Sequence, residues 1–414
     1  MAHLCRTSKK LLAIATPHLY HRPAEGPWWL LLRTLIARPD LALHVRYLLD
    51  DRLWQSTVST IIALFTPSSF DQEIWSRFSG LAAYLDELRG GILRQSQDGF
   101  AGIVMLREQP TIFEFFVSLC PNVQEIATGI LLCHLFTDQP SGSLQHVRHV
   151  QMTLDSSCEL LGEPMFQGFA LIARLAIVAP NVRSIVCRFV MQSAQIRHRL
   201  PIITNLVQLH LHKSTLTLLA LARILAACPN LRSFLYHDSH LDRECPGMEC
   251  FTPWQAQEAI LRYAPALTSL DLNISDDFEL RSPADTVQSL RRLSELEHLS
   301  LDLTSLIPGI DPLNGMDPVQ VPNMDPVLLV RLLPASIRSL RLCWSTNLQD
   351  PRFEFKHLRE PLMRLAAATQ DQFPALRSIA VSLFDAQSGT EEGMDDVKAV
   401  TATFRKLGIR THIE

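Results

Sequence analysis

The sequence lacks the short motifs that mark common catalytic sites. It contains no G-x-S-x-G nucleophile elbow, no P-loop, no G-x-G-x-x-G turn and no H-E-x-x-H helix. Serine, histidine and aspartate are all present, but no spacing singles out a catalytic triad. We therefore expect a non-enzymatic protein with no cofactor and no resident metal. A hydrolase or metal enzyme in the irregular residues 50–108 is the alternative, and it would need a deep polar pocket there.

Charge is also sparse. Charged residues make up 19% of the chain and the formal net charge is −4, so neither nucleic acid nor an anionic membrane surface is an expected partner. Hydrophobic residues make up 47%, which is enough to bury a core throughout and excludes wholesale disorder. At 414 residues the chain predicts either two domains or one elongated repeat array.

Long apolar runs and paired cysteines are missing as well. The longest apolar run, residues 216–228, is interrupted by Arg223 and is too short to span a bilayer. The nine cysteines are scattered and odd in number, and several lie in apolar periodic segments where a thiol packs as a small hydrophobe. These features favour a reduced intracellular compartment, either cytoplasm or nucleus.

What the sequence does contain is a repeated leucine pattern. Residues 205–212 read NLVQLHLH, with leucines spaced as L-x-x-L-x-L, and the same skeleton occurs nine times between residues 121 and 383. Successive copies are separated by 24 residues (Val123 to Val147) up to 41 residues (Leu296 to Ile337). The first apolar positions of the copies are Val123, Val147, Val182, Leu206, Leu231, Leu267, Leu296, Ile337 and Leu376.

Proline precedes several copies, as in Pro121-Asn122 and Pro229-Asn230, and helical apolar spacing precedes the proline at residues 216–228 and 254–263. Proline stops a helix and favours an extended approach to a strand. The repeating unit is therefore predicted to be a helix, a proline turn and a short strand. The fold class is α/β: a leucine-rich-repeat solenoid with parallel strands on its concave side and helices outside, preceded by a short helical segment.

The predicted domains are a helical segment at residues 1–40 and a leucine-rich-repeat-like domain at 41–414. The second comprises an irregular helical part at 51–120, clear repeats at 121–385, and a C-terminal helix and strand cap at 394–414. Further helices are predicted at residues 28–38, 57–65, 71–89 and 395–406, a first strand at 45–48 and a last edge strand at 409–413. Pro17 is expected to end or bend the helix that precedes it in the segment 1–40. A turn is expected at 38–40, at the end of the helix predicted at 28–38.

Strand alternation separates structural from exposed positions. With Leu206, Leu209 and Leu211 inward, the intervening side chains project from the concave face. The concave face is rich in histidine, so if it binds a partner, that binding would be sensitive to pH. The alternative is an ordinary solvated sheet face without a binding role. The candidate partner-binding residues are Gln208, His210, His212, His237, Asp271, Asn273, His298, Asp302 and Arg341.

One stretch gathers zinc-ligand residue types: His237, His240, Cys245 and Cys250. Their spacings, H-x2-H and C-x4-C, differ from the tighter pairs of tetrahedral zinc sites. We therefore interpret the stretch as a loop between repeats.

Residues 4–21, LCRTSKKLLAIATPHLYH, resemble the last helix and exit segment of an F-box, as found in fungal-type F-box proteins with leucine-rich repeats. Residues 35–46 resemble the segment that opens the repeat domain in that family. In that family a Leu-Pro…Glu helix and a second helix precede this segment, whereas this sequence begins within the third helix. The F-box is therefore expected to be truncated or mis-assigned at its start, or to have lost its adaptor-binding part. The resemblance implies that Leu4, Arg6, Lys9, Leu11 and Leu12 form an adaptor-contact helix.

The resemblance further implies a substrate-recognition subunit of an SCF-type ubiquitin ligase, which binds its target through the repeat domain and leaves catalysis to partner proteins. A Skp-type adaptor and a cullin are expected partners only if the full gene product has a complete F-box. The alternative is a free-standing leucine-rich-repeat scaffold with no role in ubiquitin transfer. The identity of the protein target is not encoded in any motif.

Overall fold

The computed structural model describes residues 8–23, 28–50, 117–128, 141–153, 168–188, 200–238, 251–274, 283–306, 324–344, 355–383 and 391–413. The chain forms two compact units, Met1–Phe189 and Val190–Glu414, which we describe separately. The division falls within the repeated part of the sequence. The helices predicted at 57–65 and 71–89, and most of the irregular residues 50–108, lie outside the described residues.

The first unit is mixed α/β, with strands that follow one another in parallel. β1 pairs with β2, β2 with β3 and β3 with β4. Its elements are α2 (Lys9–His21), α3 (Trp28–Ala37), α4 (Pro39–Ala42), β1 (Tyr47–Asp50), β2 (Glu125–Thr128), β3 (His149–Thr153), α9 (Gly168–Val178) and β4 (Ser184–Arg188).

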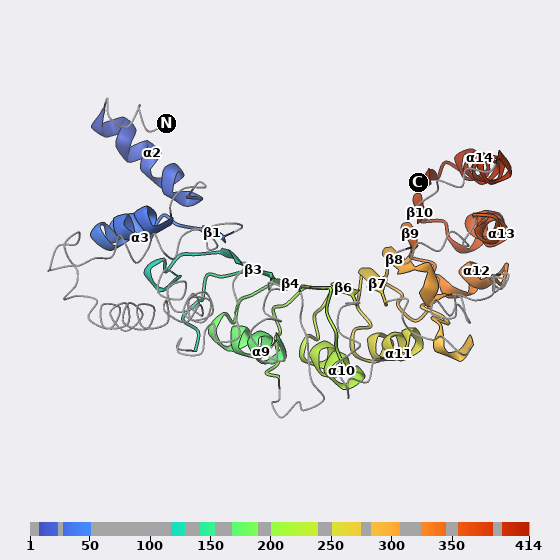
Figure 1. The fold of residues 1–414 in the computed structure, drawn as a ribbon, viewed down its shortest axis with the longest axis horizontal. Coiled ribbons are helices and arrows are strands. Elements are labelled where there is room, and N and C mark those ends of the chain that lie inside the picture. The colour runs from blue at the N-terminus through green and yellow to red at the C-terminus, as the bar shows by residue number, and fades with distance from the viewer. Residues whose placement is uncertain are drawn as a thin grey trace, which may run out of the picture. The chain divides into compact units, whose positions relative to one another are not determined.

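The second unit repeats one helix-and-strand arrangement. Its strands also pair in parallel, in chain order from β5 to β11. Figure 1 shows α10 to α14 on one side of these strands, which leaves the other side of the sheet without a helix among the described residues. The elements are β5 (Gln208–His212), α10 (Leu218–Ala227), β6 (Ser233–His237), α11 (Pro253–Tyr263), β7 (Ser269–Asn273), η5 (Pro283–Asp285), β8 (His298–Asp302), η6 (Leu303–Ser305), α12 (Leu328–Leu332), β9 (Ser339–Trp344), α13 (Lys356–Gln372), β10 (Ser378–Leu383), α14 (Glu391–Lys406) and β11 (Arg410–Ile413).

The same tight turn leads into almost every strand. Before β6, the backbone N–H of Leu231 donates to the carbonyl of Cys228 (3.1 Å), and Pro229 and Asn230 occupy the two central positions. Proline suits the first central position because its fixed φ matches the turn. Equivalent bonds join Val45 to Ala42, Val123 to Cys120, Val147 to Leu144, Val182 to Ala179, Leu206 to Ile203, Leu267 to Ala264, Leu296 to Leu293, Ile337 to Pro334 and Leu376 to Phe373.

These turns place the first apolar residue of each copy in the core. All nine predicted first positions are at most 2% exposed, and Val45 before β1 is 0% exposed. Ile409 before β11 is 4% exposed. Three residues later, the inward positions of the second unit stand in register from strand to strand: Leu209, Phe234, Leu270, Leu299, Leu340 and Ile379. Each is no more than 2% exposed. The predicted strands and their inward leucines are therefore confirmed.

The helices complete the core from the other side. In α10 the hydroxyl of Thr217 accepts from the N–H of Ala220 (3.2 Å) and caps the helix, whose buried residues include Leu221, Ile224 and Leu225. This spacing of three and four residues puts the apolar side chains on one face. α11 begins with a capping box between Thr252 and Gln255. Both helices match their predicted positions.

Asparagine side chains tie successive turns together. The amide nitrogen of Asn230 donates to the carbonyl of Thr204 in the turn before (2.8 Å). Asn122 donates in the same way to Leu43 (3.0 Å), and Asn181 to Gln145 (2.9 Å). The Pro-Asn dipeptides therefore do more than end helices, because the asparagine bridges one repeat to its predecessor.

Some predicted boundaries differ from the structure, among them that of the first strand, which is predicted at 45–48 but is β1 at Tyr47–Asp50. Pro17 lies inside α2 and does not end it, as the helix continues to His21. Pro17 removes only the backbone donor to the carbonyl of Ala13, so the helix can continue past it. The hydroxyl of Thr16 donates to the carbonyl of Leu12 (2.7 Å) in the same turn. At the other end of the chain, α14 begins at Glu391, four residues before the predicted start at Asp395.

Replacing an inward residue should be far more damaging than replacing its outward neighbour. Leu209→Asp puts a charge without a partner into a position that is 0% exposed, so we expect a loss of several kcal/mol in the free energy of unfolding. His210→Ala should change it little. Urea denaturation followed by circular dichroism measures both, and equal destabilisation would contradict the assignment of faces.

The asparagine bridges should contribute measurably to stability. Asn230→Ala removes the donor to the carbonyl of Thr204, and we expect a loss of about 1 kcal/mol in the free energy of unfolding. Thr204→Ala is the matched control, because it lies in the accepting turn and leaves the backbone carbonyl in place. If both variants lost the same stability in urea titrations, the bridge would have no specific role.

Candidate functional site: the open face of the second unit

The side of the sheet opposite α10 to α14 is the candidate functional site, and we call it the open face. Its residues alternate with the buried positions along each strand and are half-buried or exposed. Strand pairing aligns them in rows across the sheet. The open face consists of Gln208, His210, His212, Ser233, Leu235, His237, Ser269, Asp271, Asn273, His298, Ser300, Ser339, Arg341, Cys343, Ser378, Ala380, Ser382, Arg410 and His412.

Most of the candidate residues predicted from the sequence lie on this face. Asp302 is the exception. Its side chain is 1% exposed, and Oδ1 accepts from the backbone N–H of Thr304 (2.8 Å) and from the Thr304 hydroxyl (2.6 Å). These bonds cap η6, so the carboxylate has a structural role at the end of β8. The residues that do reach the face are Gln208, His210, His212, His237, Asp271, Asn273, His298 and Arg341.

Three histidines come together where β5 meets β6. The His212 ring lies edge-on to His237 with centroids 5.2 Å apart, and to His210 at 6.2 Å. His237 Nε2 is 3.1 Å from Oδ1 of Asp271 on the next strand. The register between repeats thus joins residues that are 34 positions apart in sequence.

His210 is the histidine whose charge the fold most clearly opposes. Burial lowers its pKa from the ordinary value of 6.5, and His237 adds to this while Asp271 acts in the opposite direction. Gln208 Nε2 lies 2.9 Å from His210 Nε2, and Ser233 Oγ lies 3.2 Å from the same nitrogen. An amide N–H can donate to this nitrogen only when the nitrogen carries no proton, so the contacts also suit the neutral ring.

The sequence interpretation missed several members of the face. Leu235 and Ser300 occupy the same row as His210, Asp271 and Arg341. Alternation within β6 and β8 indicates both, but Leu235 is apolar and Ser300 is small and uncharged, so neither stood out as the histidines did. Cys343 also lies on the face; burial raises the pKa of its thiol, while Arg341 and a hydrogen bond from Ser300 oppose that rise.

Other described cysteines are structural. Burial raises the pKa values of Cys120, Cys187 and Cys228 to about 12, so these thiols stay protonated and unreactive at neutral pH. Cys120 and Cys228 fill the same buried position, directly before Pro-Asn in their turns. Both are free thiols, as expected for cysteines that pack as small apolar residues.

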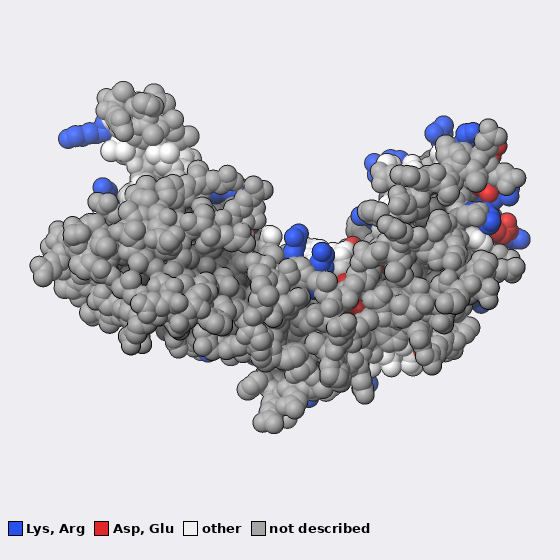
Figure 2. All heavy atoms as spheres, viewed as in Figure 1, with Lys and Arg blue, Asp and Glu red and all other residues white. Residues whose placement is uncertain are grey.

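The helical side of the second unit has charges that are already paired. Figure 2 shows Lys and Arg side chains beside Asp and Glu over α13 and α14. Arg359 pairs with Asp396 (3.2 Å), Arg364 with Glu360 (3.0 Å) and Lys398 with Asp395 (2.9 Å). Part of the charge on this side is therefore balanced locally.

In the first unit, α2 is a second candidate for an interaction role. None of its residues is buried, and it leaves Leu11, Leu12 and Ile14 exposed by 42%, 45% and 58%. Ser8 caps the helix, and Lys9 is exposed next to it. The remaining residues of the predicted adaptor-contact helix, Leu4 and Arg6, lie outside the described residues.

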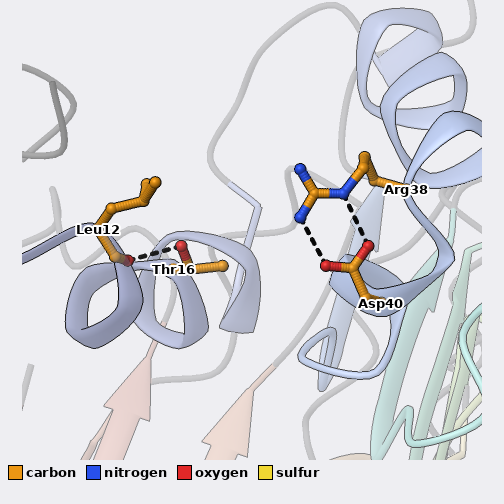
Figure 3. A network of polar contacts seen from close by, with 4 residues as sticks. All are labelled: Leu12, Thr16, Arg38 and Asp40. Carbon is orange, nitrogen blue, oxygen red and sulfur yellow. Dashed lines mark hydrogen bonds and ion pairs between the residues drawn. The ribbon is translucent and has the colours of Figure 1, made fainter. Parts of the chain in front are cut away.

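α2 packs on the short helix α4, which begins with Pro39. Figure 3 shows two parallel hydrogen bonds from the Arg38 guanidinium to the Asp40 carboxylate at the start of α4. The distance from Nε to Oδ1 is 2.8 Å, and that from Nη2 to Oδ2 is 2.6 Å. Hydrogen bonding by Arg38 lowers the pKa of the Asp40 carboxyl group. The predicted turn at 38–40 is thus the beginning of a one-turn helix, which the Arg38–Asp40 pair flanks without a side-chain cap.

The suggested zinc stretch is only partly described, since His240, Cys245 and Cys250 lie outside the described residues. Within the described residues, no three or more His, Cys, Asp or Glu side chains gather so as to hold a metal ion. In the same part of the chain, no helix is long and apolar enough to cross a membrane.

Comparison with known proteins adds no family assignment. No protein-family model matches the chain, and no curated protein matches it either.

The pKa of His210 provides a direct test of the site geometry. Burial favours the neutral ring in the folded state, so stability should fall as the pH drops below the ordinary value of 6.5 and protonation favours the unfolded chain. NMR titration of the ring protons should give His210 a midpoint below 6.5, with His210→Gln used to assign the signal. A midpoint at or above 6.5 would contradict the burial and contacts described for the ring.

Proposed function

We propose that this chain is a protein-interaction protein, built as a leucine-rich-repeat-like solenoid, and that it binds a protein target through the open face. The support for the solenoid is the repeated unit itself: a tight turn, a strand with an inward apolar ladder, and a helix on one side only. Each repeat buries its apolar face against its neighbours, as solenoid repeats do.

The observation that carries the binding role is the character of the open face. It extends over seven strands, and its side chains are mostly polar or small, with hydroxyl groups at Ser233, Ser269, Ser300, Ser339, Ser378 and Ser382. A broad sheet surface of this kind suits an extended polypeptide or a domain surface. A small-molecule site is usually concave and mostly apolar.

We further propose that the protein recruits its target to an SCF-type ubiquitin ligase. The support is the resemblance of residues 4–21 to the end of an F-box, together with the exposed apolar residues of α2. Leu11 and Ile14 lie one turn apart on the same side of the helix, which is the arrangement of residues that dock onto a partner. A Skp-type adaptor would bind here, a cullin would join through the adaptor, and catalysis would belong to partner proteins.

Separate substitutions should separate the two binding functions. The full gene product, tagged at its own locus, is purified from native cells, and its partners are identified by mass spectrometry. We expect a Skp-type adaptor and a cullin with the unmodified protein. Leu11→Asp combined with Ile14→Asp should lose both and retain the target, because the charges block docking of an apolar helix face.

Leu219→Asp is the matched control, since Leu219 is 52% exposed on α10 and should tolerate the charge. Thermal unfolding verifies that all variants are folded. Recovery of a target without adaptor or cullin would contradict the ligase role and favour a free-standing scaffold. Failure to recover any specific partner with the unmodified protein would contradict the interaction role itself.

A further inference from the structure

The open face has an unbalanced positive charge, although the whole chain has a net charge of −4. Its permanently charged side chains among the described residues are Arg341, Arg410 and Asp271. Asp271 is already engaged by His237 at 3.1 Å, and both are about one-third exposed. The two arginines are exposed, so the charge offered to a partner is cationic.

Many arginines of this unit have anchored guanidinium groups: Arg232 to Glu295 and a carbonyl, Arg291 to the carbonyl of Val330, Arg338 to Glu297 and Arg377 to the carbonyl of Pro374. Arg341 is not among them, and neither is Arg410, the other arginine of the open face. Within the described residues, Arg341 has no hydrogen bond or ion pair. Its donors therefore remain available to a ligand.

The surroundings of Arg341 are small and polar. Its register partners are Ser300 on β8 and Ala380 on β10, and Ser339 and Cys343 are the next residues on its own side of β9. Ser378 donates to Ser339 across β9 and β10 (3.0 Å). The Arg341 side chain is therefore longer than its neighbours. A planar anionic group can approach the paired N–H donors of its guanidinium group without a steric obstacle from them.

We infer that the open face binds an acidic, extended segment of a partner protein, with an Asp or Glu carboxylate of that segment held by Arg341. This inference rests on the proposed interaction role and specifies the chemistry of the target. A second carboxylate can reach Arg410, which lies two strands away, roughly 10 Å across the sheet. Arg410 is also displaced by two register positions along the strands, which makes the separation roughly 12 Å. Residues four apart in an extended chain lie on the same side and about 13 Å from each other, so acidic residues four apart fit best.

Carboxylate fits this site better than the other anions that proteins bind. Phosphate groups are usually held by clusters of arginines, and here the next arginine on the face is two strands away. Nucleic acid requires more cations, and single strands also use aromatic side chains for stacking. The open face has no phenylalanine, tyrosine or tryptophan among its described residues.

The test is a selection of random displayed peptides on the purified full-length protein. We expect enrichment of Asp and Glu at a spacing of four residues. The best selected peptide is then made synthetically, and its affinity should fall about tenfold when Arg341→Gln removes the guanidinium. Arg341→Lys should restore only part of the affinity, because lysine keeps the charge without the fork. Affinity should also fall with added salt.

Arg292→Gln is the matched control, since Arg292 is exposed but lies outside the open face. Three results would overturn the inference: no acidic enrichment or no selected peptide, equal binding by Arg341→Gln, or tighter binding of a phosphoserine peptide or a single-stranded DNA than of the carboxylate peptide. If Arg341→Gln also retained every partner recovered from cells, the inference would fail while the proposed function stood. If the unmodified protein recovered no cellular partner, the proposed function would fail instead.

Discussion

The register between neighbouring strands is the constraint on which the rest of the structure depends. A shift of one residue would move every inward side chain of a strand to the other face, because side chains alternate along a strand. The inward ladder from Leu209 to Ile379 leaves no room for such a shift, since each member is almost fully buried. All assignments on the open face, including the contact between His237 and Asp271, follow from this register.

The turn before each strand explains how that register is maintained through repeats of unequal length. Intervals between copies vary from 24 to 41 residues, yet the hydrogen bond from the first apolar residue to the residue three before it recurs in all nine copies. Loops inserted after a strand are therefore accommodated without changing how the next strand begins. Where the turn contains asparagine, as at Asn230, the side chain adds a bond to the preceding turn. Stability thus resides in the turns and the inward ladder, while the open face can carry residues chosen for binding.

Features with a local cause were predictable from the sequence. The strands followed from the L-x-x-L spacing, and α10 and α11 from apolar periodicity that ends before a proline, because each of these signals lies within a few residues. Pro17 was expected to end or bend its helix, and the helix does not end there but continues to His21, because the loss of one backbone donor leaves the hydrogen bonds of the neighbouring residues intact. Asp302 was misjudged because alternation predicts its direction, whereas its side chain turns back to bond Thr304 two residues later. The histidine contacts and the isolation of Arg341 depend on pairing between distant repeats, which no single segment encodes.

The central claim is that partners bind the open face. Chemical modification of histidines by diethyl pyrocarbonate, read by mass spectrometry, tests it directly on the unmodified protein with and without a partner purified from cells. His298 is exposed on the open face, whereas His146 is exposed in the turn before β3 and provides an internal reference. The account predicts that the partner protects His298 and His237 and leaves His146 reactive. Unchanged reactivity of His298 in the saturated complex would contradict it.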